Sequence, residues 1–250
     1  MIDWKKAAVV VLDVFIGAYL VLAVTAFNKP DEEAAVCTDL QITIEQEAVD
    51  GFLTADKVVH LLQQKHINPV SEPMGKVNTR QIEEALMANT LIDKAECYKT
   101  QTGKVCLTIK QRIPVIRVMA QNGDDYYVDS RGELMKSEGY NCHTVVATGH
   151  IGKQYAKKVL APLANTIITD NFWKKQTVQF NVLSDGSVEL IPRVGEHVAY
   201  LGQPVNIDSK LSRLRKFYRY GLNEAGWNRY SRVSVEFDNQ IVCKKKSKKI

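Results

Sequence analysis

The sequence lacks the short motifs that mark the common classes of enzyme and metal site. None of the patterns H-E-x-x-H, G-x-S-x-G, S-x-x-K or G-x-x-x-x-G-K-[ST] occurs, so no motif points to a zinc protease, a serine hydrolase or a P-loop enzyme. The five cysteines form no C-x-x-C pair, which excludes a zinc ribbon and a thioredoxin-like redox motif. Cys142 and His143 are adjacent, but neighbouring residues of a strand point to opposite sides. We therefore predict that the protein is not an enzyme, with no catalytic, metal-binding or cofactor-binding residues.

A basic surface is also missing from most of the chain. The formal net charge is +5, from 33 basic and 28 acidic residues, but five of the last seven residues are lysines. Without these five lysines the basic and acidic residues are equal in number, so the charge belongs to a tail. We expect no nucleic-acid binding, and we interpret residues 244–250 as a basic disordered tail.

Long apolar runs are absent except for one, from Ala7 to Phe27. Its 21 residues would span about 32 Å as a helix, enough to cross a hydrocarbon core of about 30 Å. Lys5 and Lys6 precede the run, and acidic residues follow soon after it. The sequence therefore predicts a transmembrane helix over residues 7–27, a cytoplasmic tail over residues 1–6 and a linker over residues 28–37, with the rest outside the cytoplasm.

Two alternatives compete with a membrane anchor, and one residue is unexpected in it. A cleaved signal peptide would use Val24-Thr25-Ala26 as its cut site, although the run exceeds the about 7–15 apolar residues typical of a signal core. A buried core helix would carry a polar stripe, which this run lacks. Asp13 lies inside the run, where it either contacts a partner transmembrane helix or tilts toward the cytoplasmic interface.

The number of cysteines is odd, so at least one is unpaired or pairs between chains. Cys97 and Cys106 flank a predicted hairpin turn. A four-residue loop from Thr100 to Gly103 would place them opposite each other, close enough for a disulfide. Two separate thiols fit the pattern equally well.

The first half of the extracytoplasmic region predicts the order β-α-α-β-β over residues 38–112. An alternating strand at residues 41–44 precedes an amphipathic helix that begins after Thr54. Asn78 is the predicted cap of a second helix. Two strands follow, at residues 92–100 and 104–112.

The second half predicts a mixed antiparallel β domain with flanking helices over residues 113–243, which gives the α+β class. Asn122-Gly123 indicates a hairpin, and residues 151–168 have helical periodicity with a kink or late start at Pro162. Another hairpin is predicted at residues 184–187. Asp208 or Ser209 is expected to cap a helix that points its cations, including Lys210 and Arg213, outward.

The last element is predicted as a long strand, Ser231 to Cys243, in which one face packs inward, formed by Val233, Val235, Phe237, Ile241 and Cys243. The last strand of a sheet is often an edge, whose unpaired backbone groups accept a strand from another chain. The alternative is that another strand of the same protein covers this edge.

Four stretches together resemble the FtsQ/DivIB family of bacterial cell-division proteins. Residues 48–54, AVDGFLT, are similar to the start of that family's POTRA domain, and QRIPVIRV at residues 111–118 is similar to its domain junction. YYVDSRG at residues 126–132 resembles its hairpin motif, and residues 233–243 resemble its final strand. The order and spacing of the four cover nearly the whole chain.

The resemblance implies a non-enzymatic scaffold in the cytoplasmic (inner) membrane at the division septum, with its bulk in the periplasm. Its partners would be FtsB/DivIC-like and FtsL-like single-pass proteins, bound by strand addition to the C-terminal edge, with no small-molecule substrate. Carried over by position, the partner-binding residues are Tyr230 and Arg232 at the entrance of the strand, and Phe237, Asn239 and Ile241 along it.

Two other functions remain open from the sequence. A POTRA-bearing component of protein secretion or envelope assembly is the first, although no barrel sequence follows the POTRA-like part. An envelope enzyme with an unrecognised site is the second.

Overall fold

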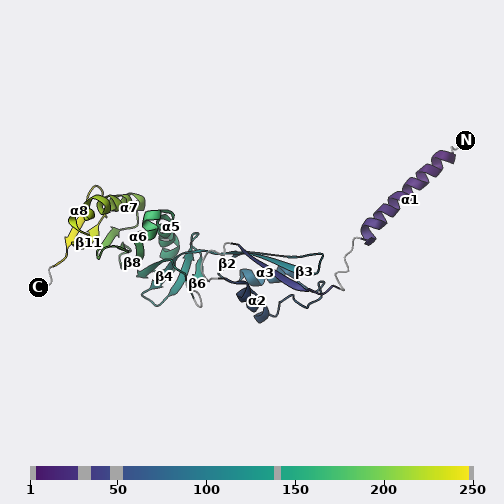
Figure 1. The fold of residues 1–250 in the computed structure, drawn as a ribbon, viewed down its shortest axis with the longest axis horizontal. Coiled ribbons are helices and arrows are strands. Elements are labelled where there is room, and N and C mark those ends of the chain that lie inside the picture. The colour runs from purple at the N-terminus through teal and green to yellow at the C-terminus, as the bar shows by residue number, and fades with distance from the viewer. Residues whose placement is uncertain (1–3, 28–34, 46–52, 138–141, 248–250) are drawn as a thin grey trace. The chain divides into compact units, whose positions relative to one another are not determined.

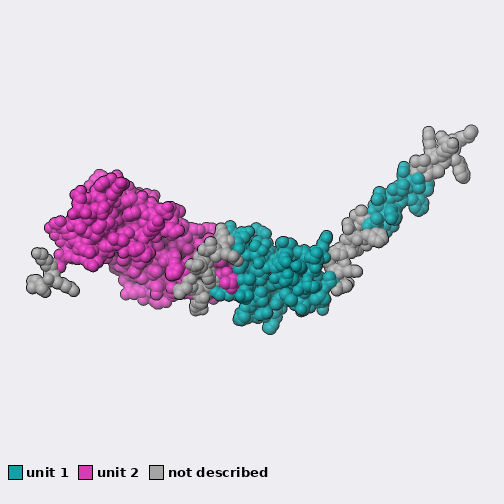
Figure 2. Space-filling view, viewed as in Figure 1, with its two compact units in different colours: residues 1–45, 55–88, 94–110 teal, residues 46–54, 89–93, 111–250 magenta. Residues whose placement is uncertain are grey.

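A computed structural model of the chain describes residues 4–27, 35–45, 53–137 and 142–247, and within the first helix it describes the side chains of residues 11–23. Much of the predicted POTRA start, residues 48–52, lies outside the described residues, as do parts of both tails and of the linker. The chain divides into two compact units (Figure 2). Unit 1 holds residues 1–45, 55–88 and 94–110, and unit 2 holds residues 46–54, 89–93 and 111–250.

The apolar run near the N-terminus is helical throughout, as helix α1 (Trp4–Phe27). Its described side chains are almost all exposed, among them Phe15 at 70% and Tyr19 at 69%. Across the described ranges, no helix combines the length and the apolar character needed to cross a membrane. The predicted helix is confirmed, and its passage through a membrane stays a prediction.

Unit 1 has the predicted β-α-α-β-β order. Its elements are β1 (Asp39–Glu45), α2 (Ala55–Gln64), α3 (Thr79–Met87), β2 (Ile92–Lys99) and β3 (Lys104–Gln111). The sheet has the order β1-β3-β2, and β1 runs parallel to β3 with Ile44 opposite Ile109. The predicted cap of α3 is confirmed, because the Asn78 side chain accepts a hydrogen bond from the N–H of Gln81 at 3.1 Å.

The hairpin between β2 and β3 differs by one residue from the predicted one. Thr100 N–H donates to the carbonyl of Lys104 at 2.8 Å, so the loop has three residues, with Gly103 at a φ of +74°. This register places buried Cys97 and half-exposed Cys106 on opposite faces of the sheet, since Cys106 lies between the buried Val105 and Leu107. Both thiols are free in the structure, and the Cys97–Cys106 disulfide that a four-residue loop would allow is not formed.

Unit 2 is built on a nine-stranded sheet with the order β12-β11-β10-β9-β8-β7-β4-β5-β6. Parallel pairs join β4 to β7, β7 to β8 and β10 to β11, so the sheet is mixed. The strands are β4 (Pro114–Ala120), β5 (Asp125–Asp129), β6 (Leu134–Lys136), β7 (Val145–Gly149), β8 (Thr177–Val182), β9 (Val188–Pro192), β10 (Val198–Gly202), β11 (Tyr230–Ser234) and β12 (Val242–Lys245).

Two helical segments pack on this sheet and close its core (Figure 1). The first comprises α4 (Lys153–Tyr155), the π-helical η1 (Ala156–Leu160), α5 (Ala161–Thr169) and α6 (Asn171–Gln176). The second comprises α7 (Ile207–Lys216), the π-helical η2 (Phe217–Leu222) and α8 (Asn223–Ala225). Their apolar sides meet alternate residues of the central strands, for example Leu163 and Leu214 with Phe180 and Leu190.

Two predicted features of unit 2 that depend on only one or two residues are confirmed. The Asn122-Gly123 hairpin joins β4 to β5, with Gly123 at a φ of +90°. Pro162 lies at the start of α5, directly after the π-helical turn, so the predicted irregularity is present. The cap of α7 is wrong in the prediction: Asn206, with a φ of +54°, precedes the helix instead of Asp208 or Ser209.

The predicted strand from Ser231 to Cys243 is wrong, because the segment folds as a hairpin. β11 ends at Ser234, a connection follows over residues 235–241, and β12 returns antiparallel to β11. Asn239 adopts a left-handed φ of +61° in the connection, a conformation that asparagine tolerates in turns. Two lysines of the predicted disordered tail, Lys244 and Lys245, therefore belong to β12.

Candidate functional site

The outer side of β12 is the most accessible sheet edge of unit 2. β12 is terminal in the nine-stranded sheet, and its inner side pairs with β11. Lys246 N–H donates to the carbonyl of Arg229 at 3.1 Å, so the backbone of Lys246 faces inward. Backbone groups alternate in direction along a strand, so those of Cys243 and Lys245 point to the open side. The edge therefore presents backbone donors and acceptors that a further strand can pair with.

Two other sheet edges in the described chain are partly closed by side chains. β6 has three residues, and the N–H of its Lys136 donates to Thr90 Oγ1 at 3.2 Å. On β2, Cys97 N–H donates to Glu83 Oε1 at 2.7 Å. β1, with seven residues, is the remaining edge in unit 1. Side chains that occupy edge amides disfavour strand addition, which leaves β12 as the open edge of unit 2.

Cationic side chains line the region around β12. Arg232 of β11 pairs with Glu189 at 2.8 Å, and its guanidinium lies 4.1 Å from the centre of the Tyr200 ring. Lys244 stands opposite Arg232 and is exposed, as is Lys245. No ion pair among the described residues includes Lys244 or Lys245. Within the described residues, the edge is thus a short strand with two positive charges that have no ion-pair partner.

The structure places the predicted partner-binding residues in the C-terminal hairpin but not on its edge strand. Tyr230 and Arg232 lie in β11, one strand inward from the edge. Phe237 and Asn239 lie in the connection, and Ile241 directly precedes β12. The inward orientation expected for Phe237 is wrong, because the chain leaves the sheet after Val235 and the Phe237 side chain is exposed. Cys243, Lys244 and Lys245 form the edge itself, and the sequence analysis missed them as site residues. The signal was the Asp238-Asn239 turn, which divides the alternating segment into two strands.

A buried aromatic cluster supports the base of this hairpin. His197 Nε2 lies 2.8 Å from the Tyr218 hydroxyl, and the ring of Trp227 lies 5.1 Å from that of Tyr218. Burial lowers the pKa of His197, with a smaller contribution from Lys246, and burial raises the pKa of Tyr218. Lys246 also forms an ion pair with Glu196, which lowers the pKa of that carboxyl. The residue after β12 is therefore fixed to the segment that carries His197.

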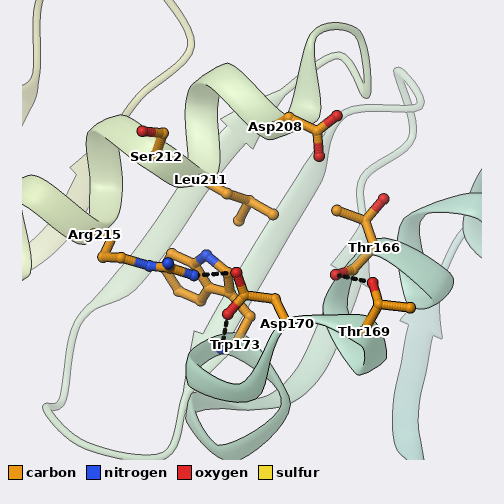
Figure 3. A pocket seen from close by; sticks show the side chains of 8 residues that line it. All are labelled: Thr166, Thr169, Asp170, Trp173, Asp208, Leu211, Ser212 and Arg215. Carbon is orange, nitrogen blue, oxygen red and sulfur yellow. Dashed lines mark hydrogen bonds and ion pairs between the residues drawn. The ribbon is translucent and has the colours of Figure 1, made fainter.

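A pocket of about 350 Å³ lies between α6 and α7, and two of its charged side chains, Asp170 and Arg215, contact each other (Figure 3). Asp170 accepts hydrogen bonds from the N–H groups of Phe172 at 2.9 Å and Trp173 at 3.2 Å, and so caps α6. Arg215 forms a hydrogen-bonded ion pair with Asp170. This hydrogen bond is the main cause of the lowered pKa of Asp170. The guanidinium also lies 4.9 Å from the centre of the Phe172 ring. The pocket's ion pair thus joins α6 to α7.

Metal ligation was not expected, and the described part of the chain contains no cluster of three or more His, Cys, Asp or Glu side chains able to hold a metal ion.

Two models of known protein families match the chain, one in each part. A model described as a POTRA-like domain matches residues 35–110, and one described as FtsQ/DivIB, C-terminal related, matches residues 113–244. The second match covers more than half of the chain and reaches Lys244, the third of the four residues of β12. The chain belongs to the FtsQ/DivIB family. Members of this family are non-enzymatic scaffolds of a cell-division complex. No curated protein matches the chain.

Two of the stretches that resemble FtsQ/DivIB proteins meet in unit 2. Arg112 of the junction motif lies with its Nη1 3.2 Å from Oδ2 of Asp129, which belongs to the hairpin motif. The Asp129 carboxylate, 3% exposed, also accepts hydrogen bonds from the N–H of Arg131 at 2.9 Å and of Glu133 at 2.8 Å. These motif residues hold the β5–β6 turn in place, which gives them a structural role.

Proposed function

We propose that the protein is a membrane-anchored scaffold of the bacterial division machinery that binds single-pass partners by strand addition to β12. The partners would be FtsB/DivIC-like and FtsL-like proteins, outside the cytoplasmic membrane at the septum. Unit 1 would serve recruitment, as its POTRA-like character implies. Family membership supports the scaffold role, and the edge geometry supports the binding mode.

The observation that carries the binding mode is the outward direction of the Cys243 and Lys245 backbone. A strand added there would extend the sheet by main-chain hydrogen bonds, which supply affinity without a deep pocket. Phe237 is 54% exposed in the connection beside this edge. Exposed aromatic side chains are frequent energetic anchors at interfaces, so Phe237 is the first side-chain contact to expect. Asn239 and Ile241 would follow it toward β12, with Tyr230 and Arg232 behind them on β11.

The membrane anchor is supported by the surface of α1. Its large apolar side chains, from Val11 to Leu22, are between 49% and 70% exposed. An apolar surface of this kind marks a membrane or protein contact. We propose that residues 7–27 cross the inner membrane with the N-terminus in the cytoplasm, and that this keeps the scaffold beside its single-pass partners.

The test removes one outward backbone donor and keeps the fold. Lys245→Pro deletes the N–H that faces the open side, and proline is tolerated where a strand's N–H faces solvent. Lys245→Ala is the matched control, because it removes the same charge but keeps the N–H. Binding of the full-length variants to the FtsB/DivIC-like protein of the same genome is measured by co-purification and titration.

We expect the affinity of the proline variant to be at least about tenfold lower than that of wild type. One main-chain hydrogen bond to the partner is lost, and the proline ring pushes the added strand away from β12. The alanine variant should bind within a few-fold of wild type. Equal binding by the proline variant and wild type would exclude strand addition at β12.

A further inference from the structure

The connection between β11 and β12 is held by an arginine from a distant helix. Arg213 of α7 donates through Nη2 to the carbonyl of Val235 at 2.9 Å and through Nη1 to Asp238 Oδ1 at 3.0 Å. Val235 is the first residue after β11, and Asp238 lies at the turn. One guanidinium therefore spans the first half of the seven-residue connection that leads into β12.

A second cation of the same helix holds the neighbouring loop. Lys210, 7% exposed, donates to the carbonyl of Gln203 at 2.7 Å, directly after β10. Burial lowers its pKa, whereas the carboxylates of Glu236 and Asp238 act in the opposite direction. Glu236 packs against Gly202, where a Cβ would come within 2.8 Å of its side chain. Lys210 and Arg213, three residues apart on α7, thus face the two loops at one end of β10 and β11.

The placement of Arg213 contributes more to a defined conformation than to stability. Its side chain is 18% exposed, and its buried Nε has no hydrogen-bond partner. Asp238, in contrast, is 73% exposed, so their ion pair is largely solvated on one side. Replacing Arg213 by an apolar side chain of similar volume would leave the Asp238 carboxylate in water, so the large penalty of leaving a buried charge without its partner should not arise. What such a replacement would remove here is the two-point attachment of the connection.

We propose that Arg213 is a positioning residue that keeps β12 in register as a docking edge, an inference that rests on the proposed strand addition. β12 has four residues and pairs on one side only. β11 is paired on both sides, with β10 and with β12, whereas β12 has backbone partners only in β11, so the register of β12 depends on how its connection is held. With the connection attached to α7 at Val235 and Asp238, the edge is ordered before a partner arrives, and less ordering entropy opposes binding.

The test compares Arg213→Met with Arg219→Met in the full-length protein. Both changes remove one positive charge from the same helical segment, but Arg219 is exposed, and its guanidinium lies 5.5 Å from the centre of the Tyr220 ring. Three quantities are measured: amide exchange at the inward-facing Val242 and Lys244, affinity for the FtsB/DivIC-like partner, and the midpoint of thermal unfolding. Arg213→Lys is the conservative variant, since an ammonium keeps the charge but not the two-pronged geometry.

For Arg213→Met we expect about tenfold faster exchange at Val242 and Lys244 and about tenfold weaker partner binding, with the unfolding midpoint within about 3 °C of wild type. Arg219→Met should match wild type in all three, and Arg213→Lys should recover part of the loss.

Unchanged exchange and affinity in Arg213→Met would overturn the proposal. A loss of affinity that only accompanies a large fall in the unfolding midpoint would also overturn it, because Arg213 would then be a general stabilising residue. If wild type itself binds no partner, the proposed strand addition fails, while the exchange rates still decide whether Arg213 orders β12.

Discussion

Removal of the Asp129 carboxylate should lower the free energy of unfolding of unit 2 more than the loss of any surface ion pair would. Asp129 is 2% exposed, and its carboxylate receives Arg112 and two backbone N–H groups. Asp129→Ala leaves these three donors without their acceptor. The guanidinium of Arg112 is then a partly buried charge, with its side chain 17% exposed.

The expected loss of unfolding free energy follows from the burial of the Asp129–Arg112 ion pair. Removing one partner of a buried ion pair lowers the free energy of unfolding by about 3–5 kcal/mol. For a domain of this size, about 2–4 °C in the unfolding midpoint corresponds to each kcal/mol, so we expect a fall of roughly 6–20 °C. Asp129→Asn keeps an oxygen for the N–H groups of Arg131 and Glu133 and loses only the charge, so its effect should be about half as large.

The measurement is urea and thermal unfolding of wild type, Asp129→Ala, Asp129→Asn, Arg112→Met and the double variant that combines Asp129→Ala with Arg112→Met. A coupling free energy of about 1 kcal/mol or more between the two sites is expected, because the side chains are in direct contact. Additive effects, or an Asp129→Ala midpoint within about 1 °C of wild type, would refute the structural role assigned to the pair.

Two further predictions concern one buried and one half-buried position of unit 2. Burial holds the pKa of His197 below its ordinary value of 6.5. As the pH drops, the imidazole is therefore protonated in the unfolded chain before it is protonated in the folded protein. The free energy of unfolding falls as the pH drops below about 6.5 toward the folded-state pKa. His197→Phe should flatten that part of a plot of unfolding free energy against pH, and an unchanged slope would contradict the assignment. Gly149→Ala should lower the unfolding free energy by about 3 kcal/mol or more, since its Cβ would lie 2.1 Å from the Val182 carbonyl at a φ of +102°. Gly152→Ala, where no atom lies within 4 Å of the new Cβ, is the control, and equal stabilities of the two variants would contradict the reasoning.

The sequence predicted the elements whose causes are local. The Asn78 cap, the Asn122-Gly123 hairpin and the irregular helix at Pro162 each depend on one or two residues, and each is present. The β-α-α-β-β order of unit 1 followed from hydrophobic periodicity, which is a strong signal over helices and strands of this length.

The errors concern features that depend on contacts far along the chain. Lys210 and Arg213 occupy the polar side of α7 by periodicity, yet loops from β10 and β11 cover them, and helical spacing carries no information about such loops. A one-residue difference in loop length moved Cys106 to the other face of its sheet.

The candidate site was predicted in its location and missed in its details. The C-terminal segment is the edge of the sheet, as expected, but the edge is β12 and not a strand through Phe237. Apolar and polar residues continue to alternate in the sequence on both sides of the turn at Asn239, so the sequence pattern does not reveal the reversal of the chain. The lysines after Cys243 were interpreted as a tail because of their charge, whereas Lys244 and Lys245 pair with β11.

Amide hydrogen exchange decides whether a partner strand pairs with the outer side of β12. The full-length protein is compared with and without the FtsB/DivIC-like partner. We expect the N–H groups of Cys243 and Lys245 to exchange rapidly in the free protein and to become strongly protected in the complex, while exchange in β1 is unchanged. Rapid exchange at Cys243 and Lys245 in the fully bound protein would contradict this pairing.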